Sequence, residues 1–228
     1  MARFIKNFSI YAGIDILGAA LGIITSPITT RLLTQKQYGT IPLIGALWAI
    51  AMILRFGGMD WSYLFFKVKK NIDHYAVLVN ATATASFFSL LTVACFACIA
   101  LCTPLVTRLV DITGLELRLY LLGLLPAAFV DWYLYILRFL HRASAFARVA
   151  ILQRIVSVVV VIPLLFLTPQ EFRLALIIGT TSSVSVVALA WALFELRKID
   201  QWPYERSEFD RSMMNQMLQY GLFMIPGG

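Results

Sequence analysis

The chain has 228 residues, of which 60% are hydrophobic and 14% are charged, and its mean hydropathy is +0.81. Soluble globular proteins carry about 45–50% apolar and about 25% charged residues, so this composition excludes an ordinary soluble domain. A net charge of +7 would favour a nucleic-acid partner in a soluble protein. Here the Lys and Arg residues gather at the ends of apolar segments, and we expect no nucleic-acid ligand.

Long apolar segments follow one another along the chain. Residues 75–107 and 174–194 contain no Asp, Glu, Lys or Arg, and a charge-free run of about 18 or more residues is long enough to cross a bilayer as a helix. Backbone groups in lipid must be paired within the protein, which favours helices. We predict an all-α polytopic membrane helix bundle with six transmembrane helices and the start of a seventh. The six predicted spans are residues 8–30, 39–59, 75–104, 117–137, 149–167 and 172–194.

The most polar stretch of the chain separates the last two predicted helices. Residues 195–217 combine charges of both signs with a Trp-Pro pair, a composition typical of a linker. We therefore expect an N-terminal six-helix membrane lobe at residues 1–196, a cytoplasmic linker at 197–217 and the start of a truncated seventh helix at 218–228.

The basic residues predict the orientation, because cytoplasmic connections of membrane proteins are enriched in Lys and Arg. If the N-terminus is cytoplasmic, the inside segments are the first residues, the regions 67–70 and 138–148, and the polar stretch after residue 195. All four are basic, and together they hold most of the 19 Lys and Arg residues. We expect a multi-pass protein with a cytoplasmic N-terminus.

The three cysteines, Cys95, Cys98 and Cys102, lie in one apolar segment. A C-x-x-C pair occurs in zinc and redox sites, but a zinc site needs further Cys or His ligands at a suitable spacing, which this segment does not provide. We interpret the thiols as small hydrophobic side chains and expect neither a metal nor a cofactor.

Ionisable residues within the spans are the candidates for function, since each costs about 2.5–3.5 kcal/mol on insertion scales and usually faces a cavity or a partner. Asp15 is either a lumen carboxylate for cation coupling or gating, or a packing residue paired with a nearby Arg. Asp131 and Arg138 are seven residues apart and therefore share a face of the fourth helix. Arg55 either lines a lumen or extends to the headgroups. The full set of substrate-binding candidates is Asp15, Arg31, Arg55, Asp60, Asp131, Arg138 and Arg154.

Several short motifs occur in a characteristic order. Residues 6–13 lead through an apolar helix to residues 27–34, which include Arg31; a Tyr-Gly pair follows at 38–39, and Gly-Gly-Met-Asp at 57–60. Residues 138–142 form a basic connection further on. This succession resembles the N-terminal half of the polysaccharide-biosynthesis, lipid-linked oligosaccharide (O-antigen type) flippases of the multidrug/oligosaccharidyl-lipid/polysaccharide exporter superfamily. The resemblance covers about residues 6–160.

The resemblance implies a MATE-like transporter with two six-helix lobes facing each other across a lumen. Such a protein of the bacterial cytoplasmic (inner) membrane would move a polyprenyl-diphosphate-linked oligosaccharide by alternating access, and we expect no enzymatic activity. Because guanidinium groups bind phosphate in a bidentate manner, Arg31, Arg138 and Arg154 are expected to form a cationic path, with Asp15 and Asp131 as acidic counterparts. The partners would be the lipid-linked oligosaccharide, membrane lipids, a coupling cation and glycan polymerase or assembly proteins. The chain stops soon after the seventh helix begins, so we expect the N-terminal lobe of a longer transporter.

Three other interpretations stay open. A multidrug exporter of the same superfamily would have more carboxylates and aromatic residues and fewer arginines in its lumen. A membrane-embedded enzyme of polyprenyl-sugar metabolism would carry clustered acidic or His residues at one membrane face, which the sequence does not show. An inactive truncated fragment of such a transporter would have the same sequence pattern.

Overall fold

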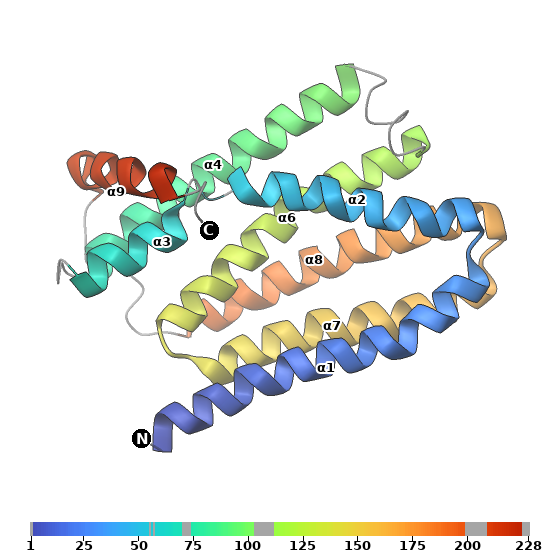
Figure 1. Ribbon diagram of the computed structural model, residues 1–228, viewed down its shortest axis with the longest axis horizontal. Helices are drawn as coiled ribbons and strands as arrows, with labels where there is room; N and C mark the ends of the chain where they lie inside the picture. The colour runs from blue at the N-terminus through green and yellow to red at the C-terminus, as the bar shows by residue number, and fades with distance from the viewer. Residues whose placement is uncertain are drawn as a thin grey trace.

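The computed structural model describes residues 2–54, 56, 58–69, 74–102, 112–198 and 209–224 (Figure 1). Within these ranges all regular secondary structure is helical, which confirms the predicted all-α class. The six longest helices are α1 (Ala2–Leu32), α2 (Gln35–Leu54), α4 (His74–Cys102), α6 (Gly114–Phe139), α7 (Ala143–Leu167) and α8 (Arg173–Arg197). The shorter elements are α3 (Met59–Leu64), η1 (Phe65–Lys69), η2 (Gln170–Phe172) and α9 (Arg211–Met224).

Five segments are long and apolar enough to cross a membrane, by length and composition over the described residues. They are Asn7–Leu32, Ala76–Leu101, Gly114–Phe139, Ala143–Leu167 and Gln170–Arg197. The predicted span 39–59 corresponds to α2, which has 20 residues and is not one of these five; several side chains in its C-terminal half lie outside the described part. The count of six spans plus a seventh therefore stays a prediction.

The predicted span 39–59 does not continue as one helix to its end. Gly58 has a φ of 73° in the left-handed region, immediately before α3 begins at Met59. Only glycine adopts this conformation without steric cost, so the apolar run is divided into α2 and α3. Apolar composition alone could not show this division.

Close packing of α6, α7 and α8 forms the centre of the bundle. α6 packs mainly on α8, and α7 packs on α8 and α1, so that α1, α7 and α8 lie side by side (Figure 1). A Cβ atom at Gly123 of α6 would lie only 2.7 Å from Ser182 Cβ of α8, so the missing side chain allows these two helices to approach closely. Trp132 and Val149 are fully buried in the main core.

Local signals mark where α6 begins and ends. Thr113 and Glu116 form a capping box at its start, in which each side chain accepts a hydrogen bond from the other residue's backbone N–H. At its end, His141 has a left-handed φ of 55°, and the N–H of Arg142 donates to the Leu137 carbonyl at 2.9 Å. This tight turn sends α7 back alongside α6.

One end of the bundle gathers the start of α1, the end of α6, the start of α7 and η1. Tyr11 and Phe146 pack edge to face, with ring centroids 5.0 Å apart. The Lys67 ammonium donates to the Phe139 carbonyl at 3.5 Å, and burial lowers the pKa of Lys67. These are regions that the sequence predicts on the cytoplasmic side.

The opposite end joins the α1–α2 connection to the α7–α8 connection. Gln37 Nε2 donates to the Gln170 carbonyl at 2.7 Å, and Arg173 donates to the Leu32 carbonyl at the end of α1. Among the described connections, α1–α2 and α7–α8 thus meet at one end while α6–α7 lies at the other, which is the grouping that the basic residues predict.

The last helix, α9, packs on α3 and α4 at the edge of the bundle (Figure 1). Asp210 begins it, accepting from the Ser212 N–H at 2.8 Å. Buried Asn80 of α4 accepts from the Asp210 N–H at 3.1 Å. The helix therefore begins within the segment 197–217 that the sequence predicts as a linker.

Candidate functional site

An ion pair between α1 and α7 brings together two of the predicted site residues. Arg154 Nη2 lies 3.2 Å from Asp15 Oδ1, and Arg154 Nη1 donates to the Ile14 carbonyl of α1. The side chains keep 36% and 77% of their surface exposed, respectively. Since both groups also line a cavity of about 540 Å³, the charges are paired and still accessible to a ligand.

This cavity adjoins two others between α1, α2, α6, α7 and α8. Gln153 lines it together with a second cavity of about 430 Å³. Thr25 and Ser157 line it together with a third of about 370 Å³. The second and third share Ile41 and Ile177. The three cavities are therefore neighbours along one side of the bundle, with the Arg154–Asp15 pair in the wall of the first.

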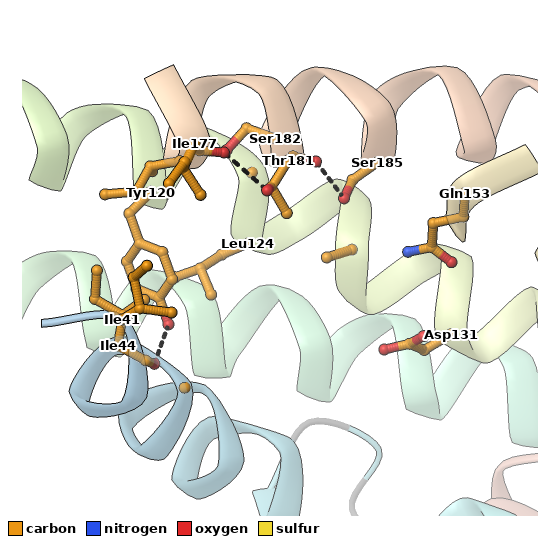
Figure 2. Close-up of a pocket in the computed structure, with 14 residues that line it drawn as sticks. Ile41, Ile44, Tyr120, Leu124, Asp131, Gln153, Ile177, Thr181, Ser182 and Ser185 are labelled. Carbon is orange, nitrogen blue, oxygen red and sulfur yellow. Dashed lines mark hydrogen bonds between the residues drawn. The ribbon is translucent and has the colours of Figure 1, made fainter. Parts of the chain in front are cut away.

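The 430 Å³ cavity has a largely apolar lining with a few polar side chains, among them Asp131, Gln153 and hydroxyl groups of α8. Asp131 and Gln153 lie toward the end away from Tyr120 (Figure 2). The hydroxyls of Ser182 and Ser185 donate to helix carbonyls at 2.8 and 3.0 Å, so their protons are committed and their lone pairs remain to accept. These few oxygens can accept hydrogen bonds from the polar groups of a ligand, while the rest of the lining is apolar.

Arg138 lies among aromatic rings instead of carboxylates. Its guanidinium carbon is 5.5 Å from the ring centroid of Tyr11, 5.9 Å from that of Tyr135 and 5.0 Å from that of Phe146. Cation–π attraction holds the charge in this arrangement. The Tyr11 hydroxyl is buried and, among the described residues, has no hydrogen-bond partner. Arg138 is nevertheless exposed, so an anion could reach it.

The remaining predicted residues are dispersed. Arg31 is exposed in the last turn of α1, about 24 Å along the helix from Asp15. Asp60 is half-buried in the first turn of α3. Arg55 lies outside the described residues. Of the predicted set, the structure thus joins Asp15 with Arg154 and distributes the others over the bundle.

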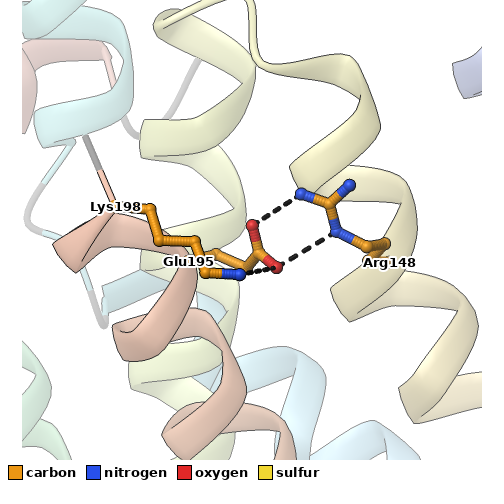
Figure 3. A network of polar contacts seen from close by, with 3 residues as sticks. All are labelled: Arg148, Glu195 and Lys198. Atoms are coloured by element: carbon orange, nitrogen blue, oxygen red, sulfur yellow. Dashed lines mark hydrogen bonds and ion pairs between the residues drawn. The ribbon is translucent and has the colours of Figure 1, made fainter.

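Sequence reasoning missed a second ion pair, between α7 and the end of α8. Arg148 Nε and Nη2 donate to the two carboxylate oxygens of Glu195 at 3.1 and 2.6 Å, and Lys198 Nζ lies 3.5 Å from Glu195 Oε1 (Figure 3). Only 3% of the Glu195 side chain is exposed. A carboxylate at the end of an apolar run was the signal, because such a group is rarely buried without a partner.

Metal-ligating residues are not clustered in the described part of the chain. No group of three or more His, Cys, Asp or Glu side chains there could hold a metal ion. Cys95 and Cys98 are free thiols on the exposed surface of α4.

The chain was also compared with known proteins. The family described as polysaccharide biosynthesis protein matches residues 4–227. The chain belongs to this family. The match confirms the resemblance drawn from the motifs, and together with the five apolar helices it indicates a multi-pass membrane protein of polysaccharide biosynthesis. No curated protein and no solved structure matches the chain.

Proposed function

We propose that the protein transports a polyprenyl-diphosphate-linked oligosaccharide across the bacterial cytoplasmic membrane. The observation that carries the proposal is Arg154, a guanidinium near the middle of a membrane-spanning helix that lines a cavity while paired with Asp15. Placing an arginine at this depth of a membrane costs free energy, so such residues usually pair with another group or line a functional cavity. Membership of the polysaccharide biosynthesis family favours a ligand with phosphate and sugar groups.

The adjoining cavities provide a route for the polar head of such a lipid. A phosphate group suits the planar fork of Arg154, and the hydroxyl oxygens of Ser182 and Ser185 in the cavity beyond Gln153 can accept hydrogen bonds from sugar hydroxyls. Asp15 balances the charge of Arg154 when no anion is bound. The polyprenyl tail stays in the surrounding lipid, so only the head needs a polar path.

The wider proposal follows the family resemblance. The chain forms a six-helix lobe, with α2 as the second span, that faces a second lobe across a lumen and works by alternating access. Its N-terminus is cytoplasmic, it performs no covalent chemistry, and a coupling cation and glycan-assembly proteins are its further partners.

Arg154→Ala in the native gene tests the proposal. Loss of one charge-assisted contact corresponds to about 1.5–3 kcal/mol, so we expect surface polysaccharide to fall about tenfold or more, measured by quantitative glycan analysis alongside the amount of inserted protein. Arg118→Ala is the matched control, because Arg118 is an exposed arginine of α6 away from the three cavities. Wild-type export by a normally inserted Arg154→Ala protein would contradict the proposal.

A further inference from the structure

Arg154 reaches α1 through a gap that a single residue leaves open. Ile14, Asp15 and Gly18 lie on one face of α1, since residues three and four apart are neighbours on a helix. A Cα–Cβ bond points toward the helix N-terminus, so a side chain at residue 18 would cover the turn that holds the other two residues. The Arg154 guanidinium occupies this space: a Cβ atom at Gly18 would lie 2.6 Å from Arg154 Cζ and 3.2 Å from Nε.

We propose that Gly18 is a positioning residue, whose missing side chain seats the Arg154 guanidinium on α1 in the geometry that the ligand anion meets. This inference rests on the proposed function for its role in transport. The seat itself, made by the Ile14 carbonyl, the Asp15 carboxylate and the bare Gly18 backbone, is independent of what the protein carries.

The atoms around Gly18 distinguish this role from ordinary helix packing. At Gly58 and Gly123, an added Cβ would meet backbone atoms of another helix, Gly221 Cα at 2.7 Å and Ser182 Cα at 2.9 Å. At Gly18, the three nearest atoms all belong to the end of the flexible Arg154 side chain. A methyl group at residue 18 therefore displaces the guanidinium, while α1 and α7 keep their packing.

Two other glycines of α1 provide matched controls. A Cβ atom at Gly13 or at Gly22 would have nothing within 4 Å, so alanine fits at either position. Gly22 lines the cavity beside Arg154 and so controls for an added methyl group in its wall, while Gly13 is not part of that lining. Each Gly→Ala change also increases helix propensity by about 1 kcal/mol. Gly13→Ala, Gly18→Ala and Gly22→Ala therefore increase helix propensity equally, but only Gly18→Ala displaces the Arg154 side chain.

The experiment measures the reactivity of Arg154 directly. Purified full-chain protein is treated with phenylglyoxal, which modifies accessible guanidinium groups, and modification of the Arg154 peptide is followed by mass spectrometry. An exposed ion pair contributes at most about 1 kcal/mol, so it can slow the modification of its arginine by only a small factor. We therefore expect Gly18→Ala, which breaks the pair, to accelerate modification about two- to fivefold. Gly13→Ala and Gly22→Ala should match the wild type. An unchanged rate in Gly18→Ala would overturn the inference.

Surface-polysaccharide export by the same variants tests the role in transport. We expect Gly18→Ala to lower export toward the Arg154→Ala level at normal insertion, with no further loss in the double variant. The loss of export caused by Gly18→Ala should be smaller in an Arg154→Lys background. An ammonium is more compact than a guanidinium, so it needs less of the space that the missing side chain of Gly18 leaves open. Faster modification with wild-type export in Gly18→Ala would overturn the positioning role. Wild-type export in Arg154→Ala would instead overturn the proposed function and leave the seat to be judged by the modification rates.

Discussion

Two ion pairs attach α7 to its neighbours, and their surroundings give them different roles. Arg154 and Asp15 are both open to a cavity, and pairs of this kind contribute about 0–1 kcal/mol to stability. Only 3% of the Glu195 side chain is exposed, and its two carboxylate oxygens accept hydrogen bonds from Nε and Nη2 of Arg148. The first pair therefore suits ligand exchange, while the second stabilises the contact between α7 and α8.

This contrast predicts the effect of removing each arginine on stability. Arg148→Ala leaves a buried carboxylate without its bidentate partner, and we expect the free energy of unfolding to fall by about 2 kcal/mol, less than for a fully buried pair because Arg148 is half exposed. Arg154→Ala should cost under about 1 kcal/mol. Thermal unfolding of the detergent-solubilised protein measures both. A larger loss from Arg154→Ala than from Arg148→Ala would contradict the assignment.

The sequence indicates which residues need a partner but not which partner each one finds. Pairing with a nearby Arg was one of two interpretations of Asp15, and the structure provides Arg154, which is 139 positions away in the chain. Likewise, Asp131 and Arg138 share α6 as predicted, yet Asp131 lines a cavity while Arg138 lies among aromatic rings. These outcomes depend on how helices far apart in the sequence pack together: α1 against α7 for Asp15 and Arg138, and α2 and α8 against α6 for Asp131.

At the scale of elements, α9 is held by a small number of specific contacts. Ser62 Oγ donates to the Met217 carbonyl at 2.6 Å, and Phe65 stacks on Tyr220 with ring centroids 4.0 Å apart. Asn80 holds its first turn, as described above. An isolated helix of 14 residues is marginal in water, so these contacts account for its order.

Removing the Asn80 side chain should loosen α9 selectively. Asn80→Ala leaves the Asp210 N–H without its acceptor, at a cost of about 1–3 kcal/mol, which corresponds to about tenfold faster amide exchange in residues 211–224. Hydrogen–deuterium exchange with mass spectrometry measures this change. α6 and α8 serve as internal controls, and uniform acceleration across them would show global destabilisation instead of a local effect.

Long charge-free runs were sufficient to predict α4 and α8, because length and apolarity are the physical requirements for crossing a membrane. Two boundaries could not be obtained in this way. The break at Gly58 depends on one left-handed φ. Asp210 is of a type that favours helix starts, but the contacts with α3 and α4 that stabilise α9 cannot be read from residues 195–217.

At the scale of the whole molecule, the two ends of the bundle hold different helix connections, which allows the orientation in the membrane to be tested. The α6–α7 turn belongs to the end that the basic residues predict as cytoplasmic, and η2 belongs to the other. Ser144 and Glu171 are exposed at these two ends. The grouping of the described connections was predictable from charge, whereas the three cavities were not. The first depends on the packing of α1 against α7, and the other two depend also on the packing of α2 against its neighbours.

Cysteine labelling tests the orientation. After Cys95, Cys98 and Cys102 are replaced by Ala, Glu171→Cys should react with a membrane-impermeant maleimide in intact spheroplasts. Ser144→Cys should react only after the membrane is permeabilised. Export by each variant confirms a functional protein, and the opposite labelling pattern would contradict a cytoplasmic N-terminus.

The seating of Arg154 has a thermodynamic consequence. A guanidinium has five N–H donors, and among the described residues its hydrogen bonds to α1 use two of them. An anion can therefore bind the remaining edge while the link between α1 and α7 stays intact. Occupancy would then be coupled to the cohesion of this helix pair, since a ligand that binds only the assembled site stabilises it by mass action. Under the proposed function, the protein without a bound anion is therefore less rigid at this helix pair than the protein with one.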